Sequence, residues 1–167
     1  MWTPSPDHPL RLHFAGLTEQ TFIESLGLAD PPLTDYLSDM LSRFISMDAI
    51  YRLRNTQGKR LEEVVEMVLE AEAVPPEGRT CREIHRHIGD FTLFWTGLYP
   101  EMLRRLRHAF SRDQFIDYCE QGKRSYRIAS SFEDEQAPVL RRLSEEYEIV
   151  AYGLNQVRRE WERHPPH

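Results

Sequence analysis

The chain has 167 residues, of which 40% are hydrophobic and 29% are charged, and its formal net charge is −6. This length and composition are typical of a single globular domain and exclude a wholly disordered or fibrous chain. The negative charge also disfavours general binding to nucleic acid, because affinity for phosphate backbones comes mostly from basic side chains.

The location of the protein is indicated by what its sequence lacks. The densest apolar run, residues 91–99, is about half of the roughly 20 residues that span a bilayer and contains two threonines and a glycine. Residues 1–9 have neither the basic start nor the apolar stretch of a secretory signal. Cys81 and Cys119 lie outside any zinc-binding spacing and are expected to be free thiols. We therefore expect a cytoplasmic protein without membrane association.

Helix signals recur along the whole chain, and no long alternating run indicates a strand. We predict an extended segment over residues 1–16, a single helical domain over residues 17–163 and a flexible tail over residues 164–167. The domain is expected to be an all-α, compact bundle of about six helices.

The first two helices are predicted from their end signals. The first runs from about Thr18, which serves as the N-cap, to Leu26, and Gly27 supplies the left-handed stop. The second begins after Asp30, whose side chain caps a first turn that tolerates prolines. Its apolar stripe continues to Tyr51, so we expect one helix up to that residue.

A third helix is predicted over about residues 59–73 and a fourth over about residues 81–99. Thr80 and Glu83 form the pattern of a capping box at the start of the fourth. This aromatic-rich helix is expected to lie at the centre of the bundle, because its apolar stripe is long and regular. The stripe consists of Ile84, Ile88, Phe91, Trp95 and Leu98.

A second face of the fourth helix carries Gly89, Leu93 and Gly97, which are four residues apart. Residues at this spacing lie on one side of a helix, and the two glycines permit close contact with another helix. This face indicates either the centre of the bundle or an interface between two copies of the chain.

The remaining helices are predicted at the C-terminal end. Ser111 and Gln114 form another capping-box pattern, which opens a fifth helix that runs to about Ser130 and turns Phe115 inward. A long C-terminal helix is expected over about residues 135–163, starting near Asp134, because its apolar stripe is nearly continuous.

Four ionisable residues fall on or beside apolar stripes, where an unpartnered charge is costly, so each needs a partner or a ligand. They are Asp48, Glu72, His87 and Glu146. Together with Glu83, they suggest a carboxylate and histidine metal site formed by Glu72, Glu83, His87 and Glu146. The sequence lacks the Glu-x-x-His spacing that di-metal helical bundles use, which weakens this hypothesis. Asp90 is expected to pair with Arg86, four residues before it.

Two further sites are weaker. Arg104, Arg105 and Arg107 form the densest basic cluster, which is more typical of a solvated helix face than of a nucleic-acid site. An aromatic block could line a flat hydrophobic ligand, although its helical spacing favours ordinary core. The block consists of Phe91, Phe94, Trp95, Tyr99, Tyr126, Tyr147 and Trp161.

No phosphate loop and no nucleophile motif is present, so the sequence assigns no enzyme class. The leading hypothesis is a non-catalytic protein-interaction module without a cofactor, which self-associates or binds another protein through the face with Gly89, Leu93 and Gly97. The alternative hypothesis is an iron- or manganese-binding bundle with oxidase-like activity.

Overall fold

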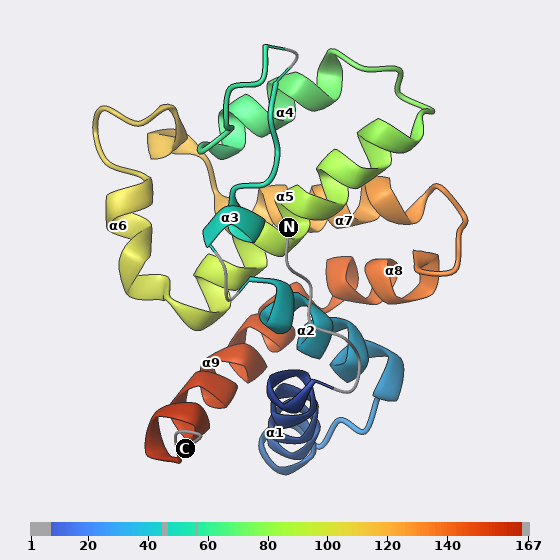
Figure 1. The fold of residues 1–167 in the computed structure, drawn as a ribbon, viewed down its shortest axis with the longest axis vertical. Coiled ribbons are helices and arrows are strands. Elements are labelled where there is room, and N and C mark those ends of the chain that lie inside the picture. The colour runs from blue at the N-terminus through green and yellow to red at the C-terminus, as the bar shows by residue number, and fades with distance from the viewer. Residues whose placement is uncertain (1–7, 45–46, 56, 165–167) are drawn as a thin grey trace.

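The computed structural model describes residues 8–44, 47–55 and 57–164, and within these ranges the chain is all-α with no named β-strand (Figure 1). The α-helices are α1 (Pro9–Leu26), α2 (Pro31–Arg43), α3 (Met47–Ile50), α4 (Val64–Glu72), α5 (Arg79–Leu98), α6 (Leu103–Leu106), α7 (Tyr118–Ser130), α8 (Ala137–Glu145) and α9 (Tyr147–Arg163). The 3-10 helices η1 (Pro100–Met102) and η2 (Arg112–Phe115) flank α6. The all-α class is confirmed, with more segments than the six expected. No helix in the described ranges is long and apolar enough to cross a membrane.

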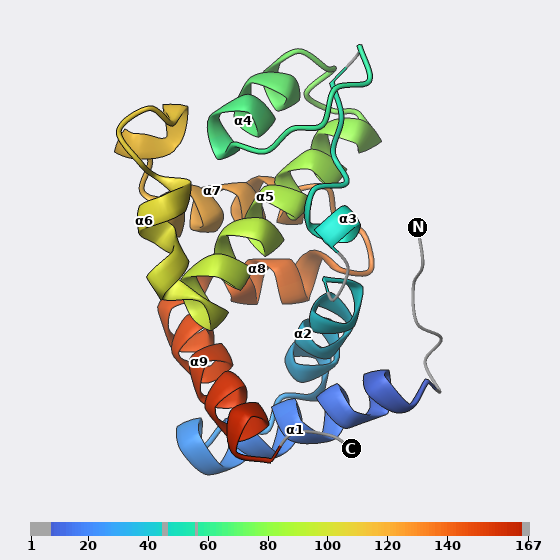
Figure 2. The same cartoon turned by 60° about the vertical axis from the view of Figure 1, so that its left-hand side comes forward.

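Helix α5 lies at the centre, as the sequence predicted, with α4, α7 and α9 packed against it (Figures 1 and 2). The five residues of its apolar stripe are all buried. Its glycines allow the neighbouring helices to approach closely. A Cβ at Gly89 would lie 2.5 Å from the Tyr126 ring of α7, and one at Gly97 would lie 3.1 Å from the Ala151 carbonyl oxygen of α9.

Helix α1 begins at Pro9, so the expected extended segment over residues 1–16 is wrong for residues 9–16. Thr18, the expected N-cap, is fully buried inside the helix. The cause is tertiary packing, because the Phe14 ring stacks on Trp161 of α9 with centroids 4.9 Å apart. Such contacts stabilise helical turns that local signals alone do not.

The Asp30 N-cap of α2 is confirmed, since its carboxylate accepts a hydrogen bond from the Leu33 N–H at 3.3 Å. The left-handed Gly27 is confirmed too, with φ of 66°. Helix α2 nevertheless ends at Arg43, and Ile50 belongs to the separate short α3, so one helix up to Tyr51 is wrong.

The third predicted helix is shorter than expected, because residues 53–55 and 57–61 lie against each other as the chain folds back. The Leu61 N–H donates to the Leu53 carbonyl at 2.9 Å, and Gly58 turns the chain with φ of 80°. Helix α4 therefore starts only at Val64, and it buries Val64, Met67 and Ala71. Glu72, which was expected on the inward face, is exposed instead.

The expected capping box at the start of α5 is wrong. The helix starts at Arg79, its N-cap is Gly78, and no side chain caps it. Thr80 therefore lies inside the first turn and cannot serve as the N-cap, and the carboxylate of Glu83 pairs with arginines instead.

The long C-terminal helix is broken at Glu146, which ends α8 and precedes α9 with φ of −115°. The break lets α8 pack on α7 while α9 packs on α5 and α1. Leu143 and Tyr147, on either side of it, are both fully buried. The prediction of one straight helix is wrong, because a straight helix could not pack on α7 and also on α5 and α1.

Candidate functional site

The four predicted metal ligands do not converge. Glu72 is exposed at the end of α4, Glu146 pairs with Arg142 at 3.0 Å, and His87 is fully buried in α5. The side chain of Asp48 lies outside the described part of the chain. Among the described residues, the three potential ligands close enough to share an ion are Cys119, Glu120 and Glu148. Lys123 already pairs with that Glu148, so no observation favours a metal there.

The predicted interface of Gly89, Leu93 and Gly97 is not on the surface. Leu93 is fully buried, and α7 and α9 of the same chain cover the two glycines. The small residues serve close packing inside the bundle, so a second copy cannot use this face.

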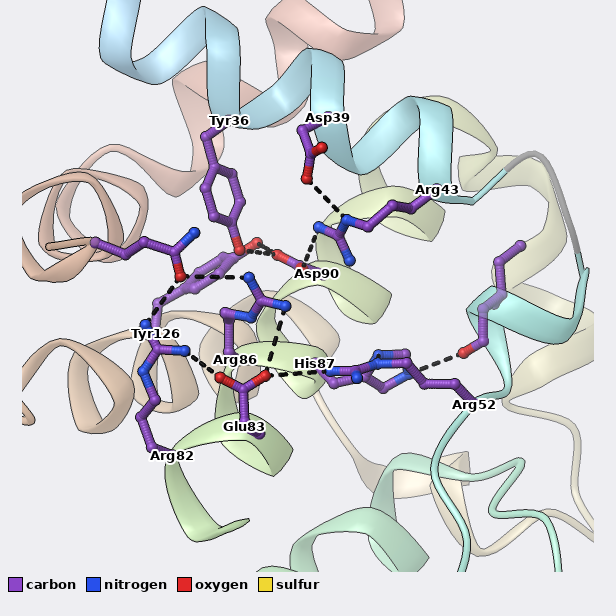
Figure 3. A network of polar contacts seen from close by, with 12 residues as sticks. Tyr36, Asp39, Arg43, Arg52, Arg82, Glu83, Arg86, His87, Asp90 and Tyr126 are labelled. Carbon is purple, nitrogen blue, oxygen red and sulfur yellow. Dashed lines mark hydrogen bonds and ion pairs between the residues drawn. The ribbon is translucent and has the colours of Figure 1, made fainter. Parts of the chain in front are cut away.

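A buried carboxylate joins three helices next to this face (Figure 3). Asp90 of α5 is 1% exposed, and its Oδ1 accepts hydrogen bonds from the Tyr36 and Tyr126 hydroxyls, both at 2.7 Å. Its Oδ2 accepts one from Arg43 at 3.3 Å. The expected partner Arg86 contributes through its charge. Burial disfavours the charged form of Asp90, but Arg43, Arg86 and the two hydroxyls hold its pKa below the ordinary value.

The imidazole of His87 belongs to the same group of polar side chains as Asp90 (Figure 3). Its Nε2 lies 2.8 Å from the Ile50 carbonyl oxygen, and its Nδ1 accepts from the Arg52 guanidinium at 3.3 Å. Nε2 therefore carries the proton. Burial, assisted by the charge of Arg52, lowers the pKa of His87 to about 3. Because both ring nitrogens are engaged, neutral His87 is a structural connector and not a free base or metal ligand.

Glu83 extends this network toward solvent. Its carboxylate pairs with Arg52 at 3.6 Å, with Arg86 at 3.5 Å and with Arg82. Burial opposes the charge of Glu83, but these arginines hold its pKa below the ordinary value. Arg82 also donates to Gln136 at 2.9 Å, just before α8. Protein donors occupy the carboxylates throughout, so the arrangement suits locking the helices together and not proton transfer.

The pH dependence of folding stability tests whether buried, neutral His87 has this structural role. Because the pKa of His87 is about 3 in the folded chain and about 6.5 in the unfolded one, the unfolded state takes up the proton first as pH falls. Folding stability should drop from about pH 6.5 downward by up to about 1.4 kcal/mol per pH unit. His87→Gln, which keeps a donor for Ile50, should show a shallower drop in urea unfolding measured between about pH 6.5 and 4.5. Equal slopes for the two proteins would contradict a neutral buried His87.

A different kind of feature lies at the surface, in residues 103–115, which we call the limb. Two phenylalanines of the limb are almost fully exposed, Phe110 at 96% and Phe115 at 89%. The limb projects from the body beside α4 (Figures 1 and 2). The expectation that Phe115 faces inward is wrong, because Ser111 caps only the short η2 and α7 starts at Tyr118.

The limb is firmly attached to α4. Asp113, which is 1% exposed, accepts hydrogen bonds from the Val64 and Val65 N–H groups at 2.8 and 2.9 Å, so it caps α4 from 49 residues away. It also accepts from the Tyr118 hydroxyl at 2.6 Å. Glu63 in turn accepts from the Ser111 hydroxyl at 2.8 Å. The exposed phenyl rings therefore stand on an ordered support, which reduces the entropy lost when a partner binds.

Sequence reasoning found the basic cluster of the limb but missed the two rings. Phe110 belongs to no periodic stripe, and that isolation was the one available signal that it is exposed. Compared with protein-family models, curated proteins and solved structures, the chain has no significant match.

Proposed function

We propose that this protein is a non-catalytic interaction module that self-associates through the end of the molecule formed by the limb and α4. The observation that carries the proposal is the pair of exposed phenylalanines on an ordered limb. Exposed aromatic side chains held on a rigid support are typical anchors of protein contacts, where a few such residues supply most of the binding energy.

The limb and α4 carry opposite charges. The limb has four arginines and one aspartate, which give it a formal charge of +3. Because the whole chain carries −6, the residues outside the limb carry −9. Residues 62–77, which include α4, contain six glutamates and no basic residue. Leu69, 52% exposed, lies among these acids. On each of the two surfaces, exposed apolar side chains are therefore surrounded by residues that mostly carry charges of one sign.

The two surfaces lie side by side. Arg112 of the limb and Glu62, Glu63 and Glu66 line one shallow hollow, together with Lys59 and Arg60. A patch with opposite charges on its two halves becomes self-complementary about a two-fold axis, because the basic half of each copy then faces the acidic half of the other. This arrangement supports a second copy of the chain as the partner.

The two rings can be removed without disturbing the fold, because both are exposed. We expect the wild-type protein to reach dimer mass as its concentration rises, in light scattering or sedimentation. Phe110→Ser with Phe115→Ser should weaken the dimer by about 30-fold or more, since loss of an aromatic anchor costs about 2 kcal/mol or more. At a concentration low enough for both proteins to be monomeric, the melting temperature should be the same for the variant and the wild type.

A matched control removes two exposed apolar side chains elsewhere. Ile149 and Tyr152 of α9 are 49% and 55% exposed, and Ile149→Ser with Tyr152→Ser should leave the dimer intact. A wild-type protein that stays monomeric at high concentration, or a Phe110→Ser, Phe115→Ser variant that dimerises normally, would contradict the proposal.

A further inference from the structure

An apolar groove is lined by residues of several helices beside the C-terminal half of α5. Its volume is about 580 Å³, and α1, α2, α5 and α9 all contribute walls, among them Phe14, Phe44, Trp95, Leu98 and Trp161. This volume lies within the range of small-molecule sites, which are mostly apolar and largely formed before the ligand binds.

The walls of the groove are recessed. Phe44, Trp95 and Leu98 bound the space although they are only 2%, 7% and 6% exposed. The rings also support one another, since Phe44 meets Phe94 edge to face at 5.3 Å and Phe94 meets Trp95 in the same way at 5.2 Å. A small molecule that enters the space between the helices can contact these walls.

The charged groups that line the groove also limit the charge of the ligand that it can bind. Among the described residues that line the groove, Arg158 is the one that carries a charge, and its guanidinium already donates to the Leu98 carbonyl at 2.7 Å and pairs with Glu101 at 2.5 Å and Glu162 at 2.9 Å. It also lies 4.5 Å from the centre of the Tyr99 ring. A charged ligand would lose its hydration without gaining a free counter-charge.

We infer that this groove binds an uncharged and largely apolar small molecule. Four members of the aromatic block noted in the sequence, Phe94, Trp95, Tyr99 and Trp161, line it. The site is separate from the limb and does not depend on self-association.

Tryptophan fluorescence provides a direct test, because Trp95 and Trp161 line the groove and the third tryptophan, Trp2, can be removed as Trp2→Phe. Titration with straight-chain alcohols should give a saturable change. The affinity should rise about fourfold for each added methylene until the groove is filled. Decanoate and decyltrimethylammonium should bind at least about tenfold more weakly than decanol. No saturable change with any alcohol, or equal binding of decanoate, would overturn the inference.

Substitutions of the partly buried Met102 test whether the fluorescence change comes from binding in the groove. Met102→Glu should lower decanol affinity at least about tenfold, because it adds an unpaired carboxylate to an apolar wall. Met102→Leu should bind as the wild type does, and equal binding by both variants would overturn the assignment.

Binding of a small molecule in the groove and self-association through the limb can be tested separately. The Phe110→Ser, Phe115→Ser variant should bind decanol normally. If decanol instead dissociates the dimer as it binds, a segment of the second copy occupies the groove and the small-molecule inference is wrong.

Discussion

Asp90→Asn is expected to lower the free energy of unfolding by about 3 to 5 kcal/mol, because it leaves buried guanidinium groups without their counter-charge. Arg43 and Arg86 both depend on this carboxylate, and an amide replaces one of its acceptor oxygens with a donor that faces other donors. Urea unfolding at neutral pH measures the change.

The chain supplies a matched control on the same arginine. Asp39 also pairs with Arg43, at 2.9 Å, but its side chain is 50% exposed. Asp39→Asn should cost less than about 1 kcal/mol, as is usual for ion pairs at the surface. Similar losses for the two variants would show that the network around Asp90 does not lock the helices.

Charge reversal on the limb is expected to have the largest effect on self-association. Arg104→Glu with Arg105→Glu places two acidic side chains opposite the acidic α4 of the second copy, and like charges facing each other across an interface cost several kcal/mol. The dimer dissociation constant should rise about 100-fold or more. Wild-type dimerisation should also weaken with added salt, which screens exposed charges.

A control with the same net charge reverses two arginines of α9. Arg159 and Arg163 are exposed in the C-terminal half of α9, and α9 runs away from α4 in both views (Figures 1 and 2). Arg159→Glu with Arg163→Glu should dimerise like the wild type. An equal loss in this variant would mean that overall charge, and not the limb, controls association.

Features that depend on nearby residues were predictable from the sequence. The stripe of α5, the Asp30 cap and the left-handed Gly27 each follow from residues within a few positions of one another. Features that depend on distant residues were not. The cap of α4 comes from Asp113, and the break at Glu146 is set by packing of α8 and α9 on different neighbours.

The candidate sites show the same division. The rule that a buried acid needs a partner is sound, but helical periodicity selected Glu72, which is exposed, and treated Asp90 as one half of a local pair. The donors that bind Asp90 directly, Tyr36, Arg43 and Tyr126, lie 36 to 54 positions away, and two of them resembled ordinary core residues. Only the folded chain brings them together.

The central claim is that the limb of one copy contacts α4 of another, and mixing two charge-reversed variants tests it most directly. The second variant is Glu70→Arg with Glu72→Arg, in the last turn of α4, where basic residues suit the helix dipole. Each variant alone should be monomeric. An equimolar mixture with Arg104→Glu, Arg105→Glu should form a heterodimer about as stable as the wild-type dimer, because both contacts regain opposite charges. A mixture that stays monomeric, as measured by native mass spectrometry, would contradict the account.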